Sequence, residues 1–160
     1  MKRIVNRLVK ALQEKQLTLA LGESMTCGLA AHQLCTVKGT SDVLKGSIVC
    51  YDPKAKIELV KIPASLIKRY SAESSQVTEA FVKKLSSLLT ADIHVAITGL
   101  AAPSVNGSES KDKPVGTVFI AIYYKNKLHS YRKLFRGNAI EIRKKACNEV
   151  YELILNTIKE

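Results

Sequence analysis

The sequence lacks the residue spacings of a metal site. Its four cysteines include no Cys-x-x-Cys pair, and none of its three histidines lies at zinc-like spacing from them. This usage is typical of free or buried thiols in a reducing compartment. We therefore expect neither a bound metal nor another cofactor.

Long apolar runs and targeting signals are also missing. No apolar run approaches the ~20 residues that span a bilayer. The N-terminal segment, MKRIVNRLVKALQEK, has charges inside its apolar pattern and no small-residue cleavage site, so it does not predict a signal peptide. We expect a cytoplasmic protein that has no membrane partner.

Acidic residues are few, 14 against 25 lysines and arginines, which gives a net charge of +11. Such an excess favours anionic partners, whether phosphate esters or nucleic acid. The basic residues are spread along the chain rather than gathered in a block, and no motif with stacking aromatic residues accompanies them. We therefore favour a small anionic ligand over a nucleic acid.

The chain has the size and composition of one globular domain. Its 160 residues are 46% hydrophobic, which is enough to bury a sizeable core. No internal repeat, linker or low-complexity tract divides it. A single domain is expected over residues 1–160.

Helical and strand patterns alternate along the chain. Helices are expected over residues 3–14, 28–36 (closed by Gly39), a short stretch from Pro53, 63–70, 74–88 and 142–158. Strands are expected over 17–21, 46–51, 93–97, 115–124 and 128–135, the last two forming a hairpin, and residues 100–113 are expected to form a loop. Helices interleaved with strands and one hairpin predict an α/β fold, a three-layer α/β/α sandwich with a mixed β-sheet.

Three expected strands end in polar turns that contain glycine or proline. These turns read ESMTCG, YDPKAK and TGLAAP. Ligand sites of open α/β sheets gather outside the carboxyl ends of the strands. The three turns are therefore candidates for one shared cleft.

The first of these turns offers several reactive groups at a strand-to-helix junction. The first N–H groups of a helix lack partners within the helix and can hold an anion. The turn also carries the Glu23 carboxylate, the hydroxyls of Ser24 and Thr26, and the Cys27 thiol. Taken singly, each has an ordinary structural interpretation, because serine and threonine commonly cap helices and a lone cysteine is commonly an inert small hydrophobe.

The ordered set of motifs is more specific than any one of them. The succession ESMTCG, VCYDPKAK, AITGLAAP and KPVGTVFIAI resembles the C-terminal domain of the CinA family, over about residues 4–158. The stand-alone members of that family are nicotinamide-nucleotide amidases. The resemblance implies hydrolysis of the carboxamide of nicotinamide mononucleotide without a metal, a small nucleotide substrate, and a homo-oligomer such as a dimer.

The resemblance also implies roles for individual residues. Ser24 is the expected nucleophile and Lys56 its base, with Tyr51 orienting the lysine or relaying a proton. A lysine acts as a base only when neutral, which requires its pKa to fall from ~10.4 towards 7–8. The remaining expected substrate-binding residues, which include backbone donors for the oxyanion, are Glu23, Thr26, Gly28, Thr98, Gly99 and Arg143.

The chain departs from the family pattern at several of these motifs. The family turn ESCTGG has Met25 and Cys27 here, and Ala102 replaces a glycine of the third motif. The family's GDR before the last helix reads GNA, so its arginine is missing, although Arg136 and Arg143 lie nearby. Two alternatives therefore stay open: a non-catalytic nucleotide-binding module, and a nucleic-acid-associated competence factor.

Overall fold

The computed structural model describes residues 2–103 and 110–159, and its strands form one five-stranded sheet in the order β2-β1-β3-β4-β5. The strands are β1 (Leu19–Glu23), β2 (Leu44–Val49), β3 (Ile93–Gly99), β4 (Thr117–Tyr124) and β5 (Lys127–Leu134). The helices are α1 (Lys2–Glu14), α2 (Leu29–Cys35), α3 (Thr40–Val43), α4 (Pro53–Glu58), α5 (Ala64–Tyr70), α6 (Ser75–Leu88) and α7 (Ala139–Thr157).

The sheet is mixed, as the sequence predicts. β1 runs parallel to β2 and β3, whereas β4 runs antiparallel to β3 and β5. β1 and β3 are buried along their whole length, because central strands that helices cover on both faces have no side open to solvent. β5, at the edge, exposes Lys127 and the alternate residues Ser130, Arg132 and Leu134, and charged residues on an edge strand discourage pairing with other chains.

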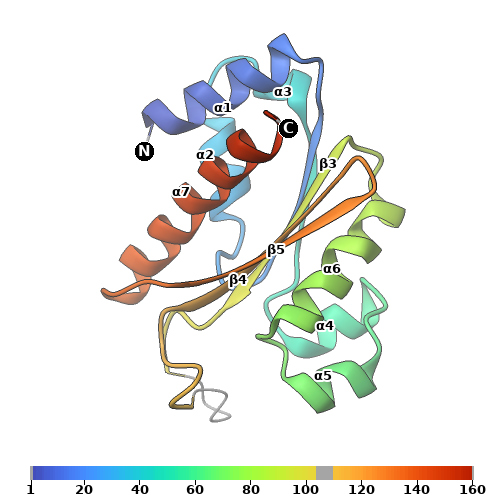
Figure 1. The fold of residues 1–160 in the computed structure, drawn as a ribbon, viewed down its shortest axis with the longest axis vertical. Coiled ribbons are helices and arrows are strands. Elements are labelled where there is room, and N and C mark those ends of the chain that lie inside the picture. Colours follow the sequence, from blue (N-terminus) through green and yellow to red (C-terminus); the bar gives the residue numbers. More distant parts are fainter. Residues whose placement is uncertain (1, 104–109, 160) are drawn as a thin grey trace.

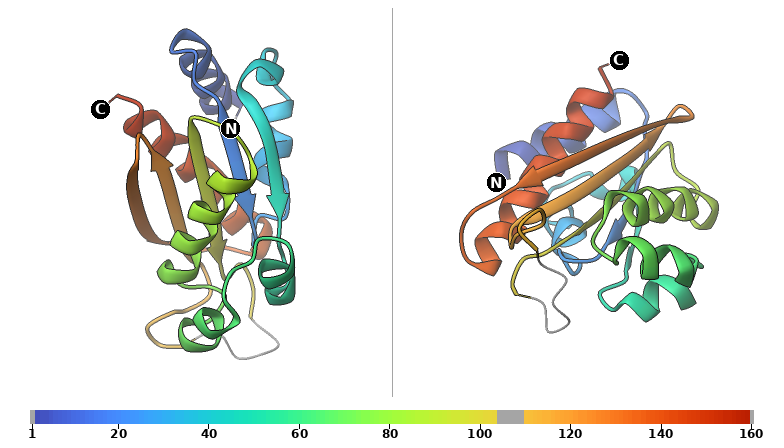
Figure 2. Two further views of the ribbon diagram at one scale, coloured as in Figure 1. Left: turned by 90° about the vertical axis from the view of Figure 1, so that its right-hand side faces the viewer. Right: turned by 60° about the horizontal axis from the view of Figure 1, so that its bottom comes forward.

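Helices cover both faces of the sheet. α1, α2, α3 and α7 lie on one face, and α4, α5 and α6 lie on the other (Figures 1 and 2). Each face has its own apolar core: Leu19 and Leu21 of β1 belong to the first, and Phe81 of α6 belongs to the second. Gly22 faces Phe81 so closely that a Cβ atom there would lie 2.8 Å from its ring. The fold is therefore the predicted three-layer α/β/α sandwich.

The predicted helices are all present, and the structure corrects some boundaries. β1 begins two residues later than expected and continues through Glu23, while β3 continues through Gly99. The short α3 was not predicted: Gly39, expected to close α2, is the N-cap of α3 in a left-handed conformation. The loop expected over 100–113 includes residues 104–109, which lie outside the described residues.

A tight turn and a helix cap shape the connections between the C-terminal elements. The β4–β5 hairpin turns at Lys125 and Asn126, both with positive φ, as a tight hairpin turn requires. Asn138 caps α7 through its side chain and forms a reciprocal capping box with Glu141. The sequence GNA that replaces the family's GDR thus supplies a helix cap.

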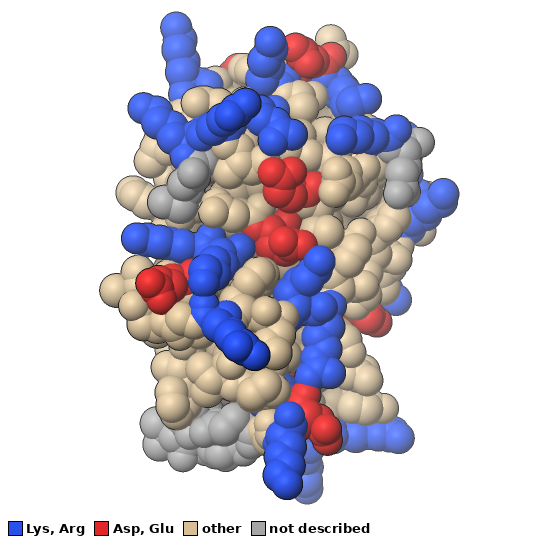
Figure 3. Space-filling model, turned by 60° about the vertical axis from the view of Figure 1, so that its left-hand side comes forward, with Lys and Arg blue, Asp and Glu red and all other residues tan. Residues whose placement is uncertain are grey.

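The excess of basic residues in the sequence is visible on the surface. On the face turned forward in Figure 3, lysine and arginine side chains are scattered, with acidic residues between them. Within residues 2–103 and 110–159, no helix is both long enough and apolar enough to cross a membrane.

Candidate active site

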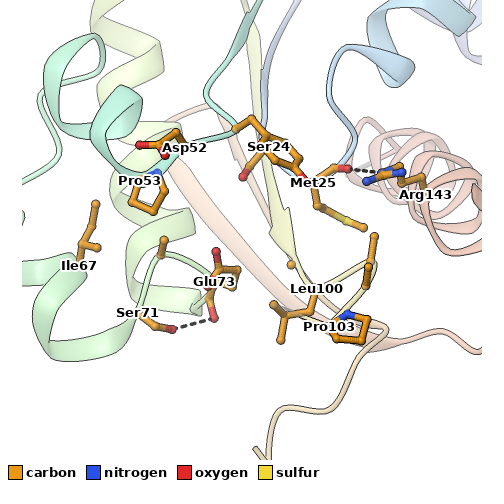
Figure 4. A pocket seen from close by; sticks show the side chains of 15 residues that line it. Ser24, Met25, Asp52, Pro53, Ile67, Ser71, Glu73, Leu100, Pro103 and Arg143 are labelled. Atoms are coloured by element: carbon orange, nitrogen blue, oxygen red, sulfur yellow. Dashed lines mark hydrogen bonds between the residues drawn. The ribbon is translucent and has the colours of Figure 1, made fainter. Parts of the chain in front are cut away.

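The carboxyl ends of the three parallel strands meet at one cleft of about 530 Å³. The ends of β1 and β2 and residues 99–103 after β3 line it, so the three predicted turns do come together. Residues 71–73 between α5 and α6 form another part of the wall, and Arg143 of α7 lies at the opposite side (Figure 4).

Ser24 and Lys56 are in direct contact at this cleft. The Lys56 Nζ atom lies 2.9 Å from Ser24 Oγ, and the lysine is fully buried while the serine is 4% exposed. The Ser24 N–H donates to the Ile97 carbonyl at 3.0 Å, which fixes the serine to the end of β3. The structure thus brings together the two residues that the sequence names as nucleophile and base.

The helix that carries Lys56 is set by local sequence. Asp52 is the N-cap of α4 and accepts a hydrogen bond from the Lys54 N–H at 2.7 Å. Pro53 follows at the first helical position, where its missing N–H costs nothing. Lys56 therefore lies one turn into α4 and projects its side chain back towards the end of β1.

The surroundings of Lys56 favour its neutral form. Burial lowers its pKa, because a charged amine loses hydration away from water, and Glu73, Cys50 and Asp52 oppose that shift. Lys56 also donates a hydrogen bond to the Cys50 carbonyl at 3.0 Å. With one N–H committed to a carbonyl that can only accept, the lone pair of a neutral Lys56 is available to the Ser24 hydroxyl.

Glu23 does not line the cleft. Its carboxylate is fully buried and accepts hydrogen bonds from the N–H groups of Gly28, Ala30 and Ala31 at 3.0–3.1 Å and from the Ser47 hydroxyl at 3.0 Å. The anion expected at the start of α2 is therefore the side chain of Glu23 itself. These N–H groups are thus already occupied, and a contact of Glu23 with the substrate stays a prediction.

The last three residues of the first turn, Thr26, Cys27 and Gly28, do not line the cleft. Gly28 is the N-cap of α2 with φ 88° and is committed to Glu23. Cys27 also has a positive φ, 51°, where a glycine is favoured over other residues. Thr26 is buried, and its hydroxyl has no hydrogen-bond partner among the described residues. It lines a separate groove of about 480 Å³ beside the cleft.

In the third turn, one predicted residue is buried away from the cleft and the other lines it. Thr98 is fully buried, and its hydroxyl lies 2.7 Å from that of Thr78 on α6, so it joins β3 to α6 rather than facing the cleft. Its predicted contact with the substrate stays a prediction. Gly99 does line the cleft, and a Cβ there would lie 2.5 Å from the Thr117 carbonyl. The close approach of β4 therefore requires glycine.

Tyr51 and Arg143 lie on the cleft and on the neighbouring groove. Tyr51 is 61% exposed, and the Lys56 side chain makes its hydrogen bonds with Ser24 and Cys50, so the predicted orienting contact from Tyr51 to the lysine is not formed among the described residues. Arg143 donates from Nε to the Met25 carbonyl at 2.8 Å. Its guanidinium group is thereby held at the rim, whereas Arg136 is exposed on the connection before α7.

Two cleft residues escaped the sequence analysis. Asp52 was recognisable as a helix cap, because it precedes a proline at a strand end. Glu73 gave no local signal: it belongs to the α5–α6 connection, just before the Ser74 cap of α6, and only the fold brings it beside Lys56. Its Oε2 atom is buried without a hydrogen-bond partner among the described residues.

The fold and site define a class of protein, an α/β/α sandwich with a buried serine–lysine pair at the carboxyl ends of its parallel strands. The family model of the CinA C-terminal domain matches residues 1–158. The chain belongs to the CinA family.

Individual relatives agree with this assignment. The chain is 36% identical over 154 residues to a CinA-like protein of Prochlorococcus marinus subsp. pastoris, covering 92% of this chain and 35% of that protein. It is 35% identical over 154 residues to a CinA-like protein of Thermotoga neapolitana, covering 96% of this chain and 36% of that protein. The chain thus spans about a third of the length of these curated relatives.

Solved structures share the fold. The competence damage-inducible protein A of Klebsiella pneumoniae subsp. pneumoniae matches with a TM-score of 0.92 at 23% identity, covering 99% of this chain and 97% of that chain. A CinA-superfamily protein of Escherichia coli matches with a TM-score of 0.88 at 26% identity, covering 96% and 88%.

Proposed function

We propose that this chain hydrolyses the carboxamide of nicotinamide mononucleotide, giving nicotinate mononucleotide and ammonia. The observation that carries the proposal is the 2.9 Å contact between Ser24 Oγ and a buried Lys56 Nζ at the cleft. A serine hydroxyl is a weak nucleophile until a neighbouring base removes its proton. A lysine whose pKa is lowered by burial can be that base.

The reaction runs in two halves. Lys56 takes the Ser24 proton as Oγ attacks the amide carbon, and the resulting tetrahedral intermediate collapses when Lys56 returns the proton to the departing ammonia. A water molecule, deprotonated by the same lysine, then attacks the ester carbon, and Lys56 returns that proton to Ser24 Oγ as the bond between the serine oxygen and the product breaks. One base thus serves both halves and ends neutral, and the product acid gives its proton to the released ammonia, which leaves a carboxylate and an ammonium ion.

The oxyanion of the intermediate needs donors close to Ser24. The Ser24 N–H is already bonded to the Ile97 carbonyl, and that of Gly28 to Glu23. We assign the task to the Met25 N–H, which follows the nucleophile directly and has no acceptor among the described residues. The substrate phosphate is proposed to bind Arg143, whose position is fixed by its hydrogen bond to the Met25 carbonyl.

The test is ammonia release from nicotinamide mononucleotide by the wild type and by Ser24→Ala. We expect release from the wild type and a loss on the order of 10⁴-fold or more in the variant. An unchanged unfolding midpoint in urea is the control that the variant is folded. A wild type that binds the nucleotide without releasing ammonia would favour the non-catalytic module, and an active Ser24→Ala would contradict the assignment of the nucleophile.

A cytoplasmic location and a homodimer are part of the same proposal. The net charge of +11 is what supports a nucleic-acid partner instead. Such a partner would bind with an affinity that falls linearly with salt on logarithmic axes. Binding to DNA or RNA at low salt, together with no ammonia release, would favour that alternative.

A further inference from the structure

The connection between α5 and α6 presents Glu73 to the cleft in a fixed orientation. The Ser71 hydroxyl donates to the Glu73 carbonyl at 3.3 Å, and Lys113 Nζ donates to the same carbonyl at 3.1 Å. Ala72 and Ser74, on either side, are buried. Figure 4 shows the Glu73 side chain pointing into the cleft on the side of Asp52, below Ser24.

One oxygen of the Glu73 carboxylate has no partner among the described residues. Its Oε2 atom is buried and accepts no hydrogen bond from the described residues, and none of the ion pairs found among them includes Glu73. A buried polar atom without a partner is costly, and more so when the group is charged. The start of α6 favours a negative charge nearby, but the Ser74 hydroxyl caps that helix, so the helix leaves the carboxylate oxygen unsatisfied.

Acidic and basic side chains lie on opposite walls of the cleft. Glu73 and Asp52 lie on one wall and Arg143 lies on the other, with Ser24 between them (Figure 4). Asp52 has one oxygen committed to the cap of α4, and Arg143 has its Nε committed to Met25. The arrangement matches a ligand that carries a positive charge at one end and a negative charge at the other.

We propose that Glu73 is the binding residue for a cationic ring in the substrate, so that this cleft selects zwitterionic amides whose ring is positive and whose far end is anionic. This inference rests on the proposed function and deepens it. The ring of nicotinamide mononucleotide is a pyridinium, whose quaternary nitrogen carries a positive charge beside the carboxamide. In the reduced nucleotide the same ring is a neutral dihydropyridine, while the amide, ribose and phosphate are unchanged.

The same contact couples substrate binding to the base. The acidic groups facing Lys56 are Glu73, Asp52 and the Cys50 thiol, and Glu73 opposes most strongly the lowering of the lysine pKa by burial. Burial raises the pKa of Cys50, which keeps that thiol neutral. A cationic ring beside Glu73 offsets its negative charge. Lys56 then loses its proton more readily when the correct substrate is bound than when the cleft is empty.

The first experiment measures binding without turnover. Calorimetry with the Ser24→Ala protein gives the affinities for nicotinamide mononucleotide and for its reduced form. The same two affinities are measured with the double variant that carries Ser24→Ala and Glu73→Gln. We expect tighter binding of the oxidised form, and a fall of roughly tenfold in that preference when the charge of Glu73 is removed. Glu58→Gln, the same change at an exposed position of α4 outside the cleft wall, should leave the preference unchanged.

The second experiment reads the coupling to Lys56 in the active protein. The pH dependence of kcat/KM reports the free enzyme and that of kcat the substrate complex. We expect the basic group to titrate at higher pH in kcat/KM than in kcat, and this gap to shrink in Glu73→Gln. A Glu73→Gln protein that weakens both nucleotides equally, or weakens neither, would overturn the inference.

The outcomes separate this inference from the proposed amidase activity. Preferential binding of the oxidised nucleotide that depends on Glu73, without ammonia release by the wild type, would support the binding role and reject the amidase. Ammonia release with no effect of Glu73→Gln on the preference would support the amidase and reject the binding role.

Discussion

Two carboxylates near the same cleft are held in opposite ways. Glu23, at the β1–α2 junction, accepts four hydrogen bonds and is sealed from solvent, whereas Glu73, in the α5–α6 connection, has a buried oxygen with no partner among the described residues. A satisfied buried carboxylate needs nothing more and serves the fold. An unsatisfied one has capacity left for a ligand. The difference separates the structural half of the site from the half that we expect to bind substrate.

The largest expected effect on stability comes from removing the Glu23 carboxylate, whose hydrogen bonds are all made within the fold. Glu23→Ala leaves the N–H groups of Gly28, Ala30 and Ala31 without their acceptor. Each unsatisfied buried donor costs about 1–3 kcal/mol, so we expect the free energy of unfolding to fall by roughly 3 kcal/mol or more. Urea unfolding measures it. Glu23→Gln, which keeps one acceptor oxygen, should lose less, and equal losses in the two variants would contradict this interpretation of the junction.

Removing the charge of Glu73, the carboxylate with an unpartnered oxygen, should leave the stability of the fold unchanged. Glu73→Gln removes a charge that no described residue satisfies, so we expect the free energy of unfolding to stay within about 0.5 kcal/mol of the wild type or to rise. Thermal unfolding of the two proteins side by side measures this, with Glu58→Gln as the matched surface change. A fall above about 1 kcal/mol would show that the carboxylate serves the fold, as Glu23 does.

A small gain in stability is expected from the backbone of the β1–α2 junction. Cys27 has a φ of 51°, a conformation that costs a side-chain-bearing residue roughly 1–2 kcal/mol. Glycine relieves that strain but adds freedom to the unfolded chain, which costs about 0.5–1 kcal/mol. Cys27→Gly should therefore raise the free energy of unfolding by up to about 1 kcal/mol. Cys27→Ala keeps the strain, so a rise of the same size there would point to the thiol instead.

The same comparison explains what the sequence could predict. The sheet was predictable because β1 and β3 are short apolar runs bounded by turns, and α6 because Ser74 precedes a stripe that includes Val77 and Phe81. The meeting of three turns at one cleft followed from the topology of parallel strands. The pairing of Ser24 with Lys56 came from the resemblance to a family, since 32 residues separate the two.

The functions of the two carboxylates were not predictable from local pattern. Glu23 follows a strand and precedes a helix, as a ligand-binding residue would, and the pattern does not show that its side chain turns back to accept hydrogen bonds from the start of α2 and from Ser47 of β2. Glu73 lies next to a helix cap and reaches Lys56 through the packing of α6 on the sheet. The three-dimensional path of the backbone therefore decides the first case, and a contact between distant segments decides the second.

The most direct test of the central claim is the pH dependence of ammonia release in the wild type and in Lys56→Met. Burial lowers the pKa of Lys56, so the base is protonated and inactive at low pH, and the rate should rise as pH passes through a value below the ordinary 10.5. Lys56→Met should lose this rise together with about 10²–10⁴-fold of the rate. A Lys56→Met protein that keeps the wild-type rate and its pH dependence would contradict the account.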